Sequence, residues 1–210
     1  MITFGKYKGK TLQHIYKFDK QYLEWLSSQI WFKERHISLY NDTLKILETK
    51  INKYNDKFLI YTDGACPYNG SSKARSSIGI HFSDKNNYHL EDVSEKLSLK
   101  NHSNNIAELL AIKKSLELVI ENKNQINVPV HLYTDSAYCK AILEEWYIKW
   151  VRNDLLDNKK NLEIIKQTYD LYKSIDDITI YKVKGHSTSN DEHSYGNRIA
   201  DKLARDALKT

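Results

Sequence analysis

The sequence has few cysteines and no long apolar run, and both features narrow the class of protein. Its two cysteines, Cys66 and Cys139, stand far apart, so they have neither metal-motif nor disulfide-framework spacing. No apolar run approaches the roughly 18 residues that a membrane helix needs. Residues 1–10 contain no apolar segment of the kind found in secretory signals. We therefore expect an intracellular protein, in the cytoplasm or nucleus, with structural cysteines and no membrane partner.

Charge is distributed unevenly along the chain. Residues 1–57 hold 11 Lys/Arg against 6 Asp/Glu, whereas residues 58–210 hold 21 of each, so the whole excess of +5 lies in the first quarter. A basic excess confined to one segment indicates a polyanion-binding module beside a separate domain. A solvated, lysine-rich surface would give the same count. The length of 210 residues suits one ordinary domain plus a small one.

The first quarter combines basic, aromatic and helical features. Glycine is scarce, with seven in the chain, yet two lie within five residues in Phe4-Gly5-Lys6-Tyr7-Lys8-Gly9-Lys10, which predicts a tight turn. Lysine and tyrosine on a turn suit phosphate contact and stacking, so the candidate nucleic-acid contacts are Lys6, Tyr7, Lys8 and Lys10. Two helical patterns follow and are interpreted as core: one holds Tyr22, Leu23, Trp25, Leu26, Ile30 and Trp31, and the other spans Ile37 to Ile51.

The turn and the Tyr22-Leu-x-Trp-Leu26 pattern resemble the small domain appended to some DnaQ-like exonucleases, over about residues 1–35. We therefore expect a small, mostly helical, basic nucleic-acid-binding domain at residues 1–52. A polar linker is expected at 53–57, and a catalytic domain at 58–210.

Two strands are predicted to end in the same way. The apolar run from Phe58 leads into Tyr61-Thr62-Asp63-Gly64, where the Asp-Gly pair predicts a turn, and the strand Val128 to Thr134 leads into Asp135. If these strands lie side by side, Asp63 and Asp135 come close together. Such a pair needs a proton or a cation because like charges repel at short range. Asp135 alone could equally be a helix N-cap.

The remaining pattern predicts a mixed α/β fold. Strands are expected at Ser77 to Phe82 and within Tyr88 to Leu99, forming an antiparallel meander with the first strand. Helices are expected over 106–120, 136–151 and 162–172, a further strand over 178–183, and a last helix from Gly196-Asn197 with Asp201 early in it. This order gives a mixed five-stranded sheet flanked by helices. Glu108 falls in the first turn of its helix, where a carboxylate interacts favourably with the helix dipole. That interaction alone could account for its presence.

Five motifs stand in the order and spacing of type 1 ribonuclease H, and from Phe58 to Leu208 the chain resembles that family. They are Tyr61-Thr62-Asp63-Gly64, Asn104-Asn105-Ile106-Ala107-Glu108-Leu109, Tyr133-Thr134-Asp135-Ser136, Gly185-His186 and Gly196-Asn197-x-x-Ala200-Asp201. The resemblance implies endonucleolytic hydrolysis of the RNA strand of RNA/DNA hybrids, with 5′-phosphate and 3′-hydroxyl products. It also implies two Mg²⁺ ions, replaceable by Mn²⁺, held by Asp63, Glu108, Asp135 and Asp201. His186 would assist metal turnover or product departure.

The resemblance also assigns substrate contacts. The 2′-hydroxyl of RNA would be read by Asn69, Asn104 and Asn105, together with Glu108 and backbone groups near Cys66, although Asn104 could equally cap a helix. The DNA strand would meet Ser103 and Asn161 at a phosphate, and Tyr138 and Trp146 along the deoxyribose. Trp150, one turn after Trp146, is interpreted as core.

The sequence departs from the family pattern in three places. The basic handle after Trp146 is shortened and keeps only Arg152, Lys159 and Lys160, so the basic first quarter is hypothesised to replace it in holding duplex. The loop from Gly185 to Gly196 is longer by about five residues, including Asp191, Glu192 and His193, which weakens the placement of His186. Asn101 stands where many members of the family have an arginine in the phosphate pocket.

Two other functions fit parts of this pattern. One is a hybrid-binding module that has lost catalysis. The presence of all four acidic residues argues against this function. The other is a resolvase or exonuclease on the same fold. The paired asparagines and the Gly-Asn-x-x-Ala-Asp motif favour ribonuclease H instead. The expected partner is an RNA/DNA hybrid, and the expected assembly is a monomer.

Overall fold

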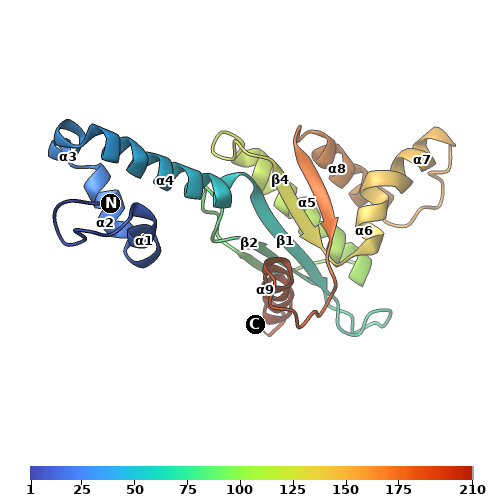
Figure 1. Cartoon of the computed structure of the whole chain (residues 1–210). Helices are drawn as coiled ribbons and strands as arrows, with labels where there is room; N and C mark the ends of the chain where they lie inside the picture. The colour runs from blue at the N-terminus through green and yellow to red at the C-terminus, as the bar shows by residue number, and fades with distance from the viewer. Residues whose placement is uncertain (210) are drawn as a thin grey trace. The chain divides into compact units, whose positions relative to one another are not determined.

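The computed structural model describes the backbone of residues 1–209 and the side chains of residues 1–47 and 56–209. The chain forms two compact units, residues 1–56 and residues 57–210. Figure 1 shows the elements of both, coloured from the N-terminus to the C-terminus. Across residues 1–209, no helix has the length and apolar character needed to cross a bilayer.

The first unit is helical, as predicted. It contains α1 (Leu12–Phe18), α2 (Lys20–Ser27), α3 (Ile30–Arg35) and α4 (Ile37–Asn55). Ahead of α1, the backbone of Ile2 donates to Lys10 O and accepts from Gly9 N, at 2.9 and 2.7 Å, which closes the predicted turn. The positive φ angles of Gly5 and Gly9 permit this turn. Its small core consists of Ile2, Leu12, Ile15, Leu23, Leu26, Phe32 and Leu47.

One expectation for this unit was wrong, because Trp25 and Ile30 are 50% and 74% exposed rather than buried. Leu23 and Leu26 form the buried face of α2 and Trp25 falls outside it, while Ile30 begins a new helix after α2 has ended at Ser27. The polar linker expected at 53–57 stays a prediction; α4 ends at Asn55 and the two compact units divide after Asp56. The side chain of Ile51, expected on the apolar face of this helix, lies outside the described residues.

The second unit is built on the predicted mixed five-stranded sheet. Its strands are β1 (Phe58–Ala65), β2 (Ser77–Phe82), β3 (Val93–Lys96), β4 (Val130–Thr134) and β5 (Ile178–Lys182), in the order β3-β2-β1-β4-β5. The pairs β1–β2 and β2–β3 are antiparallel, while β1–β4 and β4–β5 are parallel. The parallel pair β1–β4 is the one that carries Asp63 and Asp135 to the same edge.

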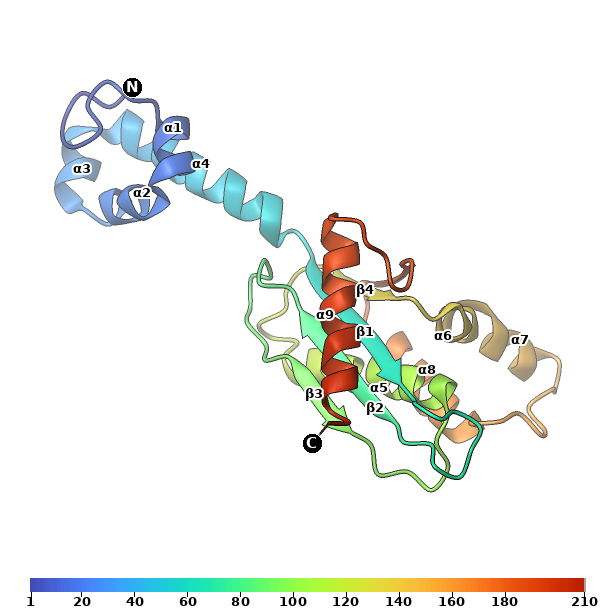
Figure 2. The same cartoon turned by 90° about the horizontal axis from the view of Figure 1, so that it is seen from below.

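Helices cover both faces of the sheet. Figure 2 shows α9 (Glu192–Asp206) lying across β1 and β2, with α5 (Asn104–Glu121) and α8 (Leu162–Lys173) on the opposite face. The larger cores lie beneath α5 and α8, where Leu109, Ile112 and Leu116 of α5 are fully buried. On the α9 face, Tyr61 and Ala200 are buried together.

Two glycines let the helices approach the sheet closely. A Cβ at Gly64 would stand 2.2 Å from Glu108 N, and a Cβ at Gly79 would stand 2.0 Å from Ala200 O. Gly64 therefore serves helix packing and not the predicted turn, because β1 continues to Ala65 and pairs with β2. These contacts bring Glu108 and the residue after Ala200, Asp201, towards β1.

The structure also corrects two predicted helices. The segment expected as one helix from Ser136 to Val151 consists of α6 (Ala137–Ala141), the π-helical turn η1 (Ile142–Trp146) and α7 (Tyr147–Arg152), and such turns are frequent at functional sites. Helix α9 begins at Glu192, not at Gly196, because Asp191 caps it by accepting from the backbone N–H groups of His193 and Ser194. Asp201 consequently lies in the second half of α9.

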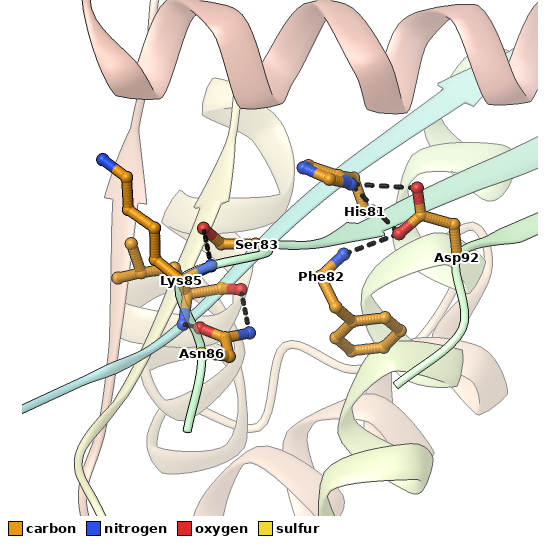
Figure 3. Close-up of polar contacts among 7 residues, drawn as sticks. His81, Phe82, Ser83, Lys85, Asn86 and Asp92 are labelled. Carbon is orange, nitrogen blue, oxygen red and sulfur yellow. Dashed lines mark hydrogen bonds and ion pairs between the residues drawn. The ribbon is translucent and has the colours of Figure 1, made fainter. Parts of the chain in front are cut away.

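The loop after β2 is tied to the beginning of β1 (Figure 3). The Asn86 side chain accepts from Leu59 N at 2.7 Å and donates to Leu59 O at 3.0 Å, imitating a paired strand residue. Asp92 accepts from Phe82 N and lies 2.9 Å from His81 Nδ1. The backbone at the start of β1 is thereby fixed from the β2 side.

Candidate active site

Four acidic side chains are directed to one place by different elements. Thr62 pairs with Thr134 across the parallel strands, so Asp63 in β1 and Asp135 directly after β4 are neighbours. Glu108 comes from the second turn of α5 and not from the predicted first turn, because the helix begins at Asn104, and it lies where α5 closely approaches Gly64. Asp201 comes from α9, which crosses β1 on the other face. The prediction that β1 and β4 lie side by side is confirmed.

Three of these carboxylates form a compact oxygen cluster. One oxygen each from Asp63, Glu108 and Asp135 lies within 4.8 Å of the other two. Asp201 stands within hydrogen-bonding reach of Asp63, and its Oδ2 lies 2.6 Å from Arg205 Nη2. The site therefore contains three clustered carboxylates and a fourth, Asp201, which lies beside them and is paired with the guanidinium of Arg205.

Burial and mutual repulsion raise the proton affinity of this cluster. Burial, followed by the charges of Asp135 and Asp201, raises the pKa of Asp63 to about 7. Burial and the same kind of repulsion also raise the pKa of Glu108, whose Oε2 is buried with no hydrogen-bond partner. Unpaired, buried carboxylate oxygens are what a hard divalent cation such as Mg²⁺ binds. The residues present thus fit a metal centre.

The cluster lies in an open cavity of about 660 Å³, and most of the predicted catalytic and RNA-reading residues reach it. Among the lining residues are Asp63, Cys66, Asn104, Glu108, Asp135, Tyr138, His186, Asp201 and Arg205. His186 lies in the loop between β5 and α9 and has a φ of +50°, which is uncommon for a residue other than glycine. The longer loop therefore still places this histidine on the wall of the carboxylate cavity.

The residues predicted to read RNA form one hydrogen-bonded group, with one exception. Asn69 Oδ1 accepts from Asn104 N at 3.3 Å, and Cys66 Sγ lies 3.9 Å from the same oxygen. Asn104 does not cap α5, because Ser103 does so by accepting from Ile106 N. The side chain of Asn104 is therefore free of the capping role, while Asn105 is exposed and does not line the cavity.

The residues predicted to meet DNA are brought together only in part. Tyr138 and Trp146 pack edge to face with ring centroids 6.2 Å apart, and Trp146 is 40% exposed. Asn161 stands within hydrogen-bonding reach of the Tyr138 hydroxyl. Ser103 is the exception, since its hydroxyl caps α5. Trp150 is partly buried, as interpreted, and Lys159 Nζ lies over its ring at 4.7 Å.

The predicted N-terminal contacts separate into two kinds. Lys6 Nζ and the Tyr7 hydroxyl both bind Asp19 Oδ2, at 3.0 and 2.8 Å. These two side chains thus brace the turn against the start of α2. Lys8 and Lys10 are exposed on the same turn and are the better placed for an external anion.

Sequence reasoning missed Arg205, which lines the cavity and pairs with Asp201. The signal was present, because residues four apart on a helix are neighbours. It was weak, since the motif ends at Asp201 and a basic residue one turn later is ordinary on an exposed helix.

Comparison with protein families gives two matches. The RNase H family model matches residues 55–209. The exodeoxyribonuclease X-like C-terminal family model matches residues 2–30, in agreement with the resemblance found in the first quarter.

Individual proteins agree with the first of these matches. The ribonuclease H of Acetivibrio thermocellus is 37% identical over 158 residues, covering 73% of this chain and 95% of the relative. That of Clostridium botulinum is 34% identical over 157 residues, covering 72% and 95%. The solved RNase H domain of prototype foamy virus is 26% identical with a TM-score of 0.53, covering 71% of this chain and 93% of that domain.

Proposed function

Because this chain belongs to the ribonuclease H family and so hydrolyses the RNA strand of RNA/DNA hybrids, we propose that Asp63, Glu108, Asp135 and Asp201 hold the metal ions of that reaction. The observation that carries the proposal is the oxygen cluster formed by the buried Asp63 and Glu108 and the half-buried Asp135, with its unpaired Glu108 Oε2. Asp201 completes the set from α9 once Arg205 no longer holds it.

Mg²⁺ is the proposed ion, with Mn²⁺ as a substitute, since the donor set consists of hard carboxylate oxygens. Two such ions would activate water and stabilise the departing 3′-oxygen, leaving a 5′-phosphate on the other product. Asp63, Glu108, Asp135 and Asp201 would place these ions where they meet the scissile phosphate. Arg205, at the cavity wall, would then be free to pair with a phosphate oxygen.

Selection of RNA is assigned to the group around Asn69. Reading a 2′-hydroxyl requires both donors and acceptors, and the Asn104 amide supplies both beside the carboxylates. Asn69 holds the Asn104 backbone in place by accepting its N–H. On the other strand, the exposed face of Trp146 and the ring of Tyr138 would pack against deoxyribose. His186 would assist departure of the product.

Residues 1–52 are proposed to hold duplex in place of the shortened basic handle. Their supports are the basic excess and the exposed Lys8 and Lys10. Residues 58–210 would then carry out catalysis as a separate domain, acting as a monomer on the hybrid.

A hybrid labelled on each strand in turn, incubated with Mg²⁺, tests the assignment. We expect internal cuts in the RNA strand alone, no cleavage by Asp135→Asn, and retained hybrid binding by that variant. RNA/RNA and DNA/DNA duplexes of the same sequence serve as substrate controls. Tight binding without cleavage of either strand under Mg²⁺ or Mn²⁺ would instead indicate a hybrid-binding module.

A further inference from the structure

The loop that carries His186 is bound to α9 by polar contacts. It connects β5, which ends at Lys182, to α9, which begins at Glu192. Arg198 Nη1 donates to Ser187 O at 2.9 Å and to Ser189 O at 2.6 Å. One turn earlier on α9, the buried Ser194 hydroxyl lies 3.1 Å from the Ser187 hydroxyl. The residue directly after His186 is therefore held twice from the same helix.

The helix that provides these contacts is itself fixed at its first turn. The His193 ring stacks on Tyr133, with centroids 4.1 Å apart and planes 17° apart, and its Nδ1 lies 3.1 Å from the Tyr61 hydroxyl. Glu192 pairs with Lys85 at 2.9 Å, from the loop after β2. Since Tyr61 and Tyr133 are strand residues, this turn is anchored on the sheet that carries the carboxylates.

The conformation of His186 requires such support. A left-handed backbone at a residue other than glycine persists only when its surroundings impose it, and His186 has a φ of +50°. The next residues, Ser187-Thr188-Ser189-Asn190, are all polar and offer no apolar side chain to bury. Ser187 and Ser189 accept hydrogen bonds within the loop, from Ser189 N and Asp191 N, and the hydrogen bonds from α9 are what tie this segment to the rest of the domain.

We infer that Arg198 is a positioning residue for the reaction, which acts by latching the loop so that His186 faces the carboxylate cavity. The inference rests on the proposed role of His186 in product departure. An arginine suits the task because its planar guanidinium donates several bonds in a fixed geometry, whereas a lysine ammonium is a point charge on a flexible stem. The Arg198 guanidinium also lies over the Tyr195 ring, 5.8 Å from its centroid.

Steady-state cleavage of a hybrid by five variants, one of them a control, tests the latch. Arg198→Ala should lower kcat by the same factor as His186→Ala, within about twofold, and the double variant should lose no more than either single change. KM should stay near that of the wild type, because the latch does not touch the bound duplex. Arg198→Lys should show most of the decrease in kcat that Arg198→Ala shows. The matched control is Lys202→Ala, an exposed basic residue on the same helix, which should leave kcat unchanged.

Backbone order of residues 185–190, measured by NMR relaxation, separates this inference from the role of His186. Order should fall in Arg198→Ala and stay unchanged in His186→Ala and Lys202→Ala. Unchanged order and kcat in Arg198→Ala, full activity in Arg198→Lys, or losses that multiply in the double variant would each overturn the latch. Lower loop order in Arg198→Ala, combined with a His186→Ala variant of full activity, would keep the latch and refute the role proposed for His186.

Discussion

Asp63 bears a strong electrostatic conflict in the site. It is 8% exposed, and burial together with the charges of Asp135 and Asp201 raises its pKa to about 7, against one stabilising hydrogen bond from Gly64 N. A bound divalent ion would relieve this conflict by replacing a proton. The same crowded carboxylates therefore give the site both its raised proton affinity and its affinity for a metal ion.

Replacing Asp63 with asparagine should stabilise the metal-free protein at high pH. A carboxyl whose folded pKa lies near 7 favours the folded state at low pH, and that contribution is lost as the pH rises from about 4 through 7. Asparagine does not ionise, so in EDTA the variant should melt several degrees above the wild type at about pH 8 and show a smaller gain at about pH 5. Equal melting temperatures at about pH 8 would contradict the account.

Metal binding should release protons and should strengthen as the pH rises towards 8. Below about pH 7 the ion must displace a proton from the Asp63 cluster, whereas above it the oxygens are already ionised. Calorimetric titration with Mn²⁺ at a fixed pH near 6.5, in two buffers of different ionisation enthalpy, measures the release. Equal heats in the two buffers would show that no proton leaves.

At the scale of elements, close helix–sheet contacts set the positions of the acids. Alanine at Gly79 would place its Cβ 2.0 Å from Ala200 O and 2.5 Å from Ala204 N, both backbone atoms of α9. We expect Gly79→Ala to lower the free energy of unfolding by about 3 kcal/mol or more and to reduce cleavage by displacing Asp201. Urea denaturation and the hybrid assay measure the two effects.

The nearest obstructing atoms belong to the backbone of α9, so they cannot move aside as the end of a side chain can. Stability and cleavage of Gly79→Ala equal to those of the wild type would contradict this account, because the path of α9 would then not limit the approach.

The strands, and the strand ends that carry Asp63 and Asp135, could be predicted from the sequence because they follow local rules, whereas Glu108 and Asp201 are assigned only through the family resemblance. Apolar runs and turn residues mark the strands, and the parallel pairing of β1 with β4 then forces Asp63 and Asp135 together. The start of α9 could not be found in this way, since Asp191 becomes a cap only when its backbone extends at φ −69° and ψ 159°. The Arg205–Asp201 pair and the Arg198 contacts likewise depend on which face α9 turns to the sheet.

At the scale of the whole molecule, charge and catalysis are divided between two units. Residues 1–56 have their own core, and the excess of basic residues lies in the first 57. The catalytic unit is nearly neutral by comparison, with 21 basic and 21 acidic residues from 58 onwards. Hydrolysis belongs to the second unit, which the RNase H family model matches, and we propose that the first unit attracts the phosphate backbone.

Removing residues 1–56 should raise KM for a long hybrid and flatten its dependence on salt, with kcat close to that of the full chain. Each phosphate contact that is lost removes its released counterions from the salt dependence. Cleavage rates measured across a series of KCl concentrations give the slope. A slope and a KM that match those of the full chain would show that the first unit does not hold duplex.

The most direct test of the metal site compares the four single carboxamide variants, Asp63→Asn, Glu108→Gln, Asp135→Asn and Asp201→Asn, for strand-specific cleavage and for Mn²⁺ binding. The account predicts that each variant folds and binds hybrid, loses at least about 100-fold in RNA cleavage, and binds Mn²⁺ more weakly than the wild type. A variant that cuts RNA at the wild-type rate, or that binds Mn²⁺ with undiminished affinity, would remove its residue from the proposed site.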